Sequence, residues 1–107
     1  MILILSHAWA LDDDHAASYI AVTEEFGSFH AAQRGFRGRR LVRDRDNPSH
    51  FINLRWWDNA EDYDLMIRDP AYPGWIERLS EHVEARSPEK LVMDVVVEHP
   101  DPTWPTS

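Results

Sequence analysis

The chain contains no cysteine among its 107 residues, and this absence excludes several kinds of site. It rules out a disulfide framework, a thiolate metal site and a cysteine nucleophile. Glycine is also scarce, and the four glycines form neither a phosphate-binding loop nor a dinucleotide-binding fingerprint. The sequence therefore gives no indication of a bound redox cofactor.

Long apolar runs are absent as well. The N-terminal segment MILILSHAWA is too short to cross a membrane, and it lacks the positively charged start of a signal peptide. We expect a cytoplasmic protein that does not bind membranes, with residues 1–9 as its first strand.

Positively charged residues are few, and the formal net charge is −8. Nucleic-acid binding needs a positive field, so we expect no nucleic-acid partner. Six of the eleven lysines and arginines nevertheless lie between Arg34 and Arg45. This cluster favours a solvated strand and hairpin balanced by acidic helices, and an anion-attracting rim is the alternative.

A metal site is not indicated either, although the chain has six histidines. No group of His, Glu and Asp residues has the spacing of metal ligands. Asp12, Asp13 and Asp14, next to His15, are typical of a helix start, where the helix dipole repels cations. We expect no bound metal.

The length and the hydrophobic pattern predict one α+β domain over residues 1–99 and a proline-rich tail over residues 100–107. After the first strand we expect a helix from Asp12–Asp14 to Gly35, strands over 36–46 and 50–58, a helix capped by Asn59 and interrupted by Pro70, a helix over about 72–86, and a strand over 90–99. The order β-α-β-β-α-β is that of a ferredoxin-like fold, an antiparallel sheet with helices on one face.

Both faces of the predicted sheet carry apolar side chains, although helices cover only one. We expect the uncovered face to include Ile52, Leu54 and Trp56, together with Ile2 and Ile4 of the first strand. A large apolar face on a small chain usually meets a partner, and the simplest partner is a second copy. The pattern therefore predicts a homodimer.

The stretch HFINLRWWD places polar side chains on the other face. Phe51, Asn53, Arg55 and Trp57 alternate along the strand and share the side that is expected to face the helices. Tyr63 follows one turn into the next helix. An amide, an indole N–H and a phenol around one space suit a flat aromatic molecule bearing a phenolate or enolate oxygen. The alternative is a purely structural role for all of them.

These residues carry a resemblance to a known family. Gly35-Phe36-Arg37-Gly38 opens the second strand, Trp57 ends the third, and Ala60-Glu61-Asp62-Tyr63 and then Asp69-Pro70 follow. In this order and spacing, from about Ile2 to His99, the chain resembles the antibiotic biosynthesis monooxygenase domain, a dimeric α+β barrel. The resemblance implies the fold and the dimer named above.

One branch of that family resembles the polyketide anthrone oxygenases, whose Asn, Trp and Tyr occur as N-x₃-W-x₅-Y. Asn53, Trp57 and Tyr63 have this spacing, and Arg78 lies near, but not in, the register of an arginine on the later helix. The resemblance implies oxidation of an anthrone, polyphenol or quinol with O₂ by these four residues, without metal or flavin, because the substrate anion reduces O₂ directly. We expect five further residues to line the substrate cavity: Phe29, His30, Arg55, Met66 and Trp75. His30 would act there as a general base, and the alternative is a histidine on the surface or paired within its helix.

Two alternatives remain. A second branch of the family degrades heme with an Asn on strand one and a Trp and a His on later helices. In this chain strand one offers His7 instead of an Asn. Trp75 and His82, seven residues apart, are the features that leave heme as a minor alternative. The other alternative is a non-catalytic dimeric protein that binds a small ligand or acts in a stress response, because fold does not fix function.

Overall fold

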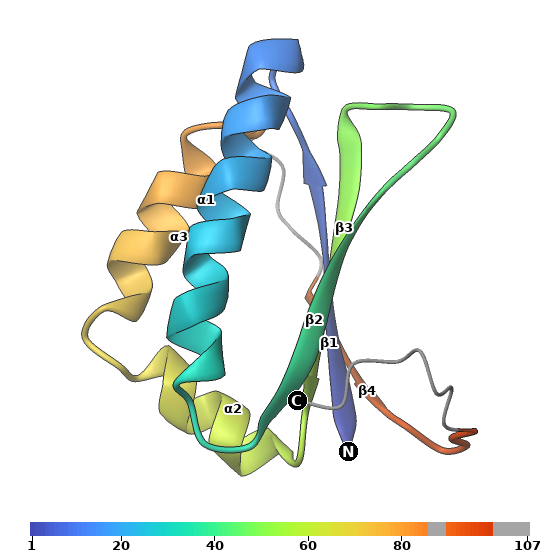
Figure 1. Cartoon of the computed structure of the whole chain (residues 1–107), viewed down its shortest axis with the longest axis vertical. Coiled ribbons are helices and arrows are strands. Elements are labelled where there is room, and N and C mark those ends of the chain that lie inside the picture. The colour runs from blue at the N-terminus through green and yellow to red at the C-terminus, as the bar shows by residue number, and fades with distance from the viewer. Residues whose placement is uncertain (86–89, 100–107) are drawn as a thin grey trace.

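The computed structural model describes residues 1–85 and 90–99. In chain order the elements are β1 (Ile2–Trp9), α1 (Asp13–Ala31), β2 (Phe36–Arg43), β3 (His50–Trp57), α2 (Ala60–Ile67), α3 (Tyr72–Ser80) and β4 (Lys90–Asp94). The strands form one antiparallel sheet in the order β2-β3-β1-β4. All three helices lie on one side of it (Figure 1). The predicted ferredoxin-like α+β fold is confirmed.

The two helices that flank the β2–β3 hairpin begin where the sequence indicates. The Asp12 carboxylate accepts a hydrogen bond of 2.8 Å from the backbone N–H of His15 and caps α1. The Asn59 side-chain oxygen accepts one of 2.9 Å from the backbone N–H of Asp62 and caps α2. Each cap satisfies a backbone donor that the helix itself leaves without a partner.

Several predicted elements were too long. The third helix ends at Ser80, because the chain turns there and Val83 pairs with Ala10 beyond the end of β1. Within this short helix the apolar side chain of Ile76 is exposed. β2 ends at Arg43 and β4 at Asp94, earlier than expected. The predicted helix end at Arg86 and the tail over residues 100–107 lie outside the described residues.

The assignment of the first strand's faces was also wrong. Ile2 pairs with Trp57 and Ile4 with Arg55, and directly paired residues point to the same face. Ile2 and Ile4 are therefore buried beneath the helices. Their neighbours Leu3 and Leu5, and not they, lie on the face without helices. Because side chains alternate along a strand, an error of one residue in register exchanges the two faces.

Candidate active site

β3 supplies the centre of the candidate site. Phe51, Asn53, Arg55 and Trp57 are each at most 5% exposed, whereas the residues between them are only partly buried. The predicted alternation is therefore confirmed, and the amide, the guanidinium and the indole all lie on the side of the helices. Trp57 packs in a cluster with Ile2, Ile4, Tyr63 and Met66.

Four polar atoms around this face have no hydrogen-bond partner among the described residues. They are Nε2 of His30, Oδ1 of Asn53, Nε of Arg55 and Nε1 of Trp57. Buried polar groups are almost always paired in proteins, and leaving one unpaired costs about 1–3 kcal/mol. Four such atoms on one side of a sheet are the pattern of a site that a polar ligand completes.

His30 comes from the last turn of α1 and is almost fully buried. Its Nδ1–H donates to the backbone carbonyl of Phe26 at 3.0 Å, which leaves the Nε2 lone pair unpaired. The ring centroids of His30 and Trp57 lie 6.2 Å apart. Burial, and then the charge of Arg55, lower the pKa of His30 to about 4. The imidazole is therefore neutral at pH 7 and offers an acceptor.

Tyr63 lies on α2 and joins the same group. Its ring meets the Trp57 ring edge to face at 5.9 Å between centroids. Burial raises the pKa of Tyr63, and the charge of Arg55 opposes this shift. The Tyr63 hydroxyl accepts a hydrogen bond from Nζ of Lys90 on β4. This bond fixes the phenol at one end of the site.

Aromatic and apolar side chains close the site on the helix side. Met66 of α2 is 1% exposed and packs with Trp57. Trp75 of α3 stacks on Phe26 of α1, with 5.2 Å between ring centroids, and Phe29 lies 6.5 Å from Trp75. Phe29 also packs against the cluster around Trp57. The structure thus brings four of the expected cavity residues to the buried face of β3: Phe29, His30, Arg55 and Met66. The fifth, Trp75, packs against Phe26 of α1.

Arg78 is not brought to this group. Its guanidinium donates to the Glu25 carboxylate at 2.5 Å on an exposed part of the surface, and it lies 4.9 Å over the ring of Trp75. Trp75 and His82, the two residues that indicated heme, contact different parts of α1. Trp75 packs near the end of α1, whereas the ring of His82 lies 5.5 Å from that of His15 at its start.

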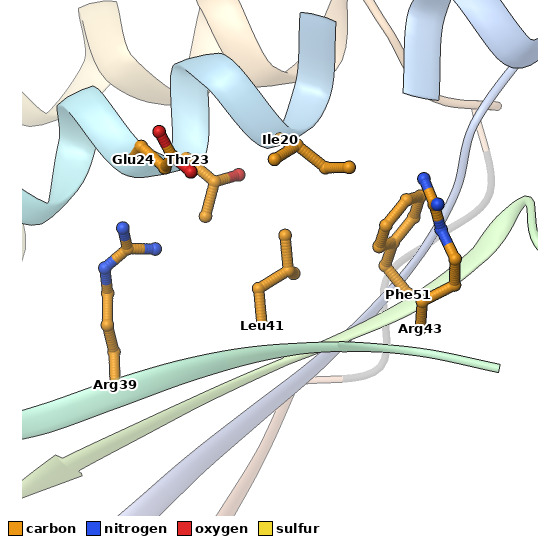
Figure 2. Close-up of a pocket in the computed structure, with 7 residues that line it drawn as sticks. All are labelled: Ile20, Thr23, Glu24, Arg39, Leu41, Arg43 and Phe51. Atoms are coloured by element: carbon orange, nitrogen blue, oxygen red, sulfur yellow. The ribbon is translucent and has the colours of Figure 1, made fainter. Parts of the chain in front are cut away.

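A hollow of about 370 Å³ opens between α1 and β2, next to the buried face of β3. In Figure 2 side chains of α1 descend toward it, and Arg39 and Arg43 rise from β2 on either side of Leu41. Its volume is in the range of pockets for small organic ligands. Seven residues line it: Ile20, Thr23, Glu24, Arg39, Leu41, Arg43 and Phe51.

The sequence did not lead us to predict that Arg39 lines this hollow. Two signals were present: period-two alternation places Arg39 on one face with Leu41, and Gly27 interrupts an otherwise regular helix. Neither signal shows that the two residues meet. In the structure, a Cβ at Gly27 would lie only 2.8 Å from Nη2 of Arg39.

Residues 2–78 match the sequence profile of the family described as antibiotic biosynthesis monooxygenase. The chain belongs to this family. No protein of curated function matches the sequence.

Several solved structures share the fold of this chain. SnoaB, a cofactor-independent oxygenase from Streptomyces nogalater, is 17% identical over 94% of this chain and 97% of its own, with a TM-score of 0.81. A candidate antibiotic biosynthesis monooxygenase from Deinococcus radiodurans is also 17% identical over 94% of this chain and 98% of its own, with a TM-score of 0.79. Rv0793 from Mycobacterium tuberculosis is 14% identical over 92% and 98%, with a TM-score of 0.73.

The described residues offer no candidate for a metal site or for a membrane-spanning helix. Within residues 1–85 and 90–99, no three His, Cys, Asp or Glu side chains lie close enough together to hold a metal ion. In that part of the chain, no helix has the length and apolar character needed to cross a membrane.

Proposed function

We propose that this member of the family is an oxygenase that inserts one atom of O₂ into an electron-rich aromatic substrate without a metal or flavin cofactor. The observation that carries the proposal is the group of unpaired polar atoms on Asn53, Trp57 and His30 beneath the helices. The family match supports the reaction class. The description of SnoaB as a cofactor-independent oxygenase supports the absence of a cofactor.

Asn53 and Trp57 would hold the oxygen atoms of the reaction. The Trp57 N–H is a donor with 0% exposed surface, and fixed donors in a dry site stabilise developing negative charge strongly. The unpaired atom of Asn53 is an acceptor, which suits a phenolic hydroxyl of the substrate. Tyr63, held by Lys90, would orient the aromatic ring from the other end.

His30 would act as the general base. Its Nε2 lone pair is free because Nδ1–H is committed to Phe26. Burial, and then the charge of Arg55, lower the pKa of His30 to about 4, so His30 is a weak base in the protein without substrate. A bound substrate anion would offset that charge and raise the proton affinity of His30, so that base strength rises only when substrate is present.

The reaction balances without any other reagent. His30 takes a proton from a CH₂ group that lies between aromatic rings, and the carbanion that remains gives one electron to O₂. The substrate radical and superoxide combine to form a C–O bond, and the peroxide takes back a proton. Loss of water then leaves a carbonyl group, with one oxygen atom in the product and one in water.

We also propose that the protein works as a homodimer. The face of the sheet away from the helices presents apolar side chains from three strands, and Leu91 and Met93 of β4 are nearly half exposed. The register of the strands puts the others on the same face: Leu3, Leu5, Ile52, Leu54 and Trp56. Packing of two such faces would cover them from water.

The test is oxygen uptake by the metal-free protein with a panel of anthrones and hydroquinones, wild type beside Trp57→Phe. Phenylalanine keeps the apolar contacts but removes the N–H donor, so we expect turnover to fall by about one to three orders of magnitude. Trp9→Phe is the matched control, because Trp9 lies at the end of β1, away from Trp57 and outside the residues named for the proposed dimer.

Equal turnover in wild type and Trp57→Phe would contradict the role of Trp57. No uptake with any substrate, together with binding of the same aromatics, would favour a non-catalytic ligand-binding protein. Heme titration would then test the remaining alternative.

A further inference from the structure

Arg39 and Arg55 form a pair of like charges inside the candidate site. They lie directly opposite each other on β2 and β3, on the face beneath the helices. Like charges at such positions destabilise a sheet. Burial lowers the pKa of Arg39, Glu24 opposes this shift, and the charge of Arg55 adds to it. The fold therefore keeps two positive charges at paired positions of one sheet face, at a cost.

No carboxylate of the described residues bonds to either group. Arg55 is 4% exposed, donates from Nη2 to the Ser6 hydroxyl at 2.6 Å, and has an unpaired Nε. Burial lowers the pKa of Arg55, and the groups that oppose this shift are the phenols of Tyr63, Tyr72 and Tyr19, not a carboxylate. Arg39 makes no hydrogen bond or ion pair within residues 1–85 and 90–99, and Glu24 acts on it only through space. A guanidinium has five N–H donors, so most donors of this pair are unused.

Gly27 makes room for the guanidinium of Arg39. An ideal Cβ at Gly27 would lie 2.8 Å from Nη2 and 2.9 Å from Nε of Arg39. A glycine inside a helix costs about 1 kcal/mol relative to alanine. α1 bears this cost at the one turn that lies against Arg39, and the side chain is thereby held under the helix and at the edge of the hollow (Figure 2).

The hollow beside the pair has the shape and lining of an aromatic site. Ile20, Leu41 and Phe51 form its apolar walls, and Arg43 covers the Phe51 ring at 4.7 Å. Leu41 is paired with Asn53 across the sheet. The hollow therefore extends along β2 from Arg39 past Leu41, whose partner on β3 is Asn53.

We propose that Arg39 and Arg55, with the gap at Gly27, form a subsite for a planar oxyanion attached to an aromatic ring. The oxyanion is a carboxylate or an ionised phenol, which Arg39 at the edge of the hollow binds through charge-assisted hydrogen bonds, and the charge of Arg55 at the paired position adds to the attraction. The subsite gives an acidic protein a local attraction for acidic aromatic molecules. The bound oxyanion would offset the repulsion between the two arginines. The proposal rests on the cavity of the proposed oxygenase and names the class of molecule that enters it.

The first test is calorimetric binding of 2-naphthoate and of its neutral isostere 2-naphthamide, without any turnover. For Arg39→Gln we expect the affinity for naphthoate to fall about ten- to a hundredfold, and that for naphthamide to change little. Arg45→Gln is the matched control, since it removes the same charge from an exposed position beyond β2. It should keep the naphthoate affinity of the wild type.

Gly27→Ala tests the same subsite without removing a charge. The added methyl group displaces the end of the Arg39 side chain, so naphthoate should bind more weakly while naphthamide is unaffected. This variant also guards against loss of folding, because alanine favours the helix. Binding of 2-naphthol below and above its ionisation distinguishes a phenolate from a carboxylate as the oxyanion.

Three outcomes would overturn the proposal: naphthoate does not bind the wild type, its affinity is unchanged in both variants, or the variants lose affinity for naphthoate and naphthamide equally. These outcomes are separate from the oxygenase test. Arg39-dependent binding without oxygen uptake would keep the subsite and reject the oxygenase. Oxygen uptake that is the same in wild type and Arg39→Gln would support the oxygenase and reject the subsite.

Discussion

At the scale of single residues, the site is built from polar groups that the fold buries without partners. His30 illustrates the cost and the use of this arrangement. Its Nδ1 bond to Phe26 fixes the ring, and burial keeps the ring neutral. The same burial that makes His30 a weak proton acceptor in the empty protein leaves Nε2 available to a ligand.

His30 should make the stability of the protein depend on pH. The unfolded histidine titrates near 6.5 and the folded one at about 4, so between these values the unfolded state binds more protons. Wild type should therefore lose up to about 3 kcal/mol of unfolding free energy as pH falls through this window, and nothing from His30 above it. His30→Gln, whose amide can still donate to Phe26, should lack this loss.

Urea unfolding of both proteins at several pH values from 4 to 7 measures the difference. Contributions of other groups cancel when the variant is subtracted from wild type. Parallel curves would show that His30 titrates normally and is not the buried neutral base of the proposal.

The sequence predicted much of this residue-scale picture, because alternation along β3 is decisive. Asn53, Arg55 and Trp57 share the buried face, as expected from their spacing. It could not predict the environment of Arg78, whose ion pair with Glu25 joins α3 to α1, nor that of Arg39 against Gly27. Both depend on how helices pack over a sheet, which short-range patterns do not encode.

At the scale of elements, the connection from α1 to β2 positions the helix that carries Tyr63. Gly35 has φ of +78°, a backbone conformation that other residues adopt only with strain. A Cβ at Gly35 would also overlap the carboxylate of Asp62, which precedes Tyr63 and is itself buried. The turn and the start of α2 therefore fit together only through a glycine.

Gly35→Ala should destabilise the protein by about 1–3 kcal/mol, because it adds both backbone strain and a clash. Gly74→Ala is the matched control: it lies in α3, and a Cβ there meets nothing within 4 Å. The control should be neutral or more stable by up to about 1 kcal/mol. Thermal unfolding compares the two, and equal midpoints would contradict the role of Gly35.

The element boundaries show where sequence reasoning stopped. Caps at Asp12 and Asn59 were predictable because one side chain bonds the next turn. The early end of α3 was not, because it follows from the pairing of Val83 with Ala10, more than seventy residues apart. The faces of Ile2 and Ile4 were misassigned for a similar reason. Register is defined by how two strands pair, so it cannot be derived from the sequence of one strand alone.

At the scale of the whole molecule, the helices cover one side of the sheet and leave the other apolar (Figure 1). The proposed dimer predicts that one charge at the centre of this face separates the protomers. Leu54→Asp should be monomeric by light scattering after size exclusion, because it would bury an unpaired carboxylate between two sheets.

The control is Leu65→Asp, which adds the same charge at an exposed position of α2. It should remain dimeric. A monomeric wild type, or a dimeric Leu54→Asp protein, would exclude the sheet face as the interface.

β3 serves two surfaces at once, since its alternate side chains form the candidate site and the face proposed for the dimer. This has a consequence for evolution. Insertion or deletion of one residue within the strand would exchange the two sets of side chains beyond that point and damage both surfaces together. Descendants of this chain can therefore vary β3 by substitution, whereas changes of length are tolerated in the turn over residues 44–49. The proposed catalytic site and the proposed dimer face would thus be inherited together.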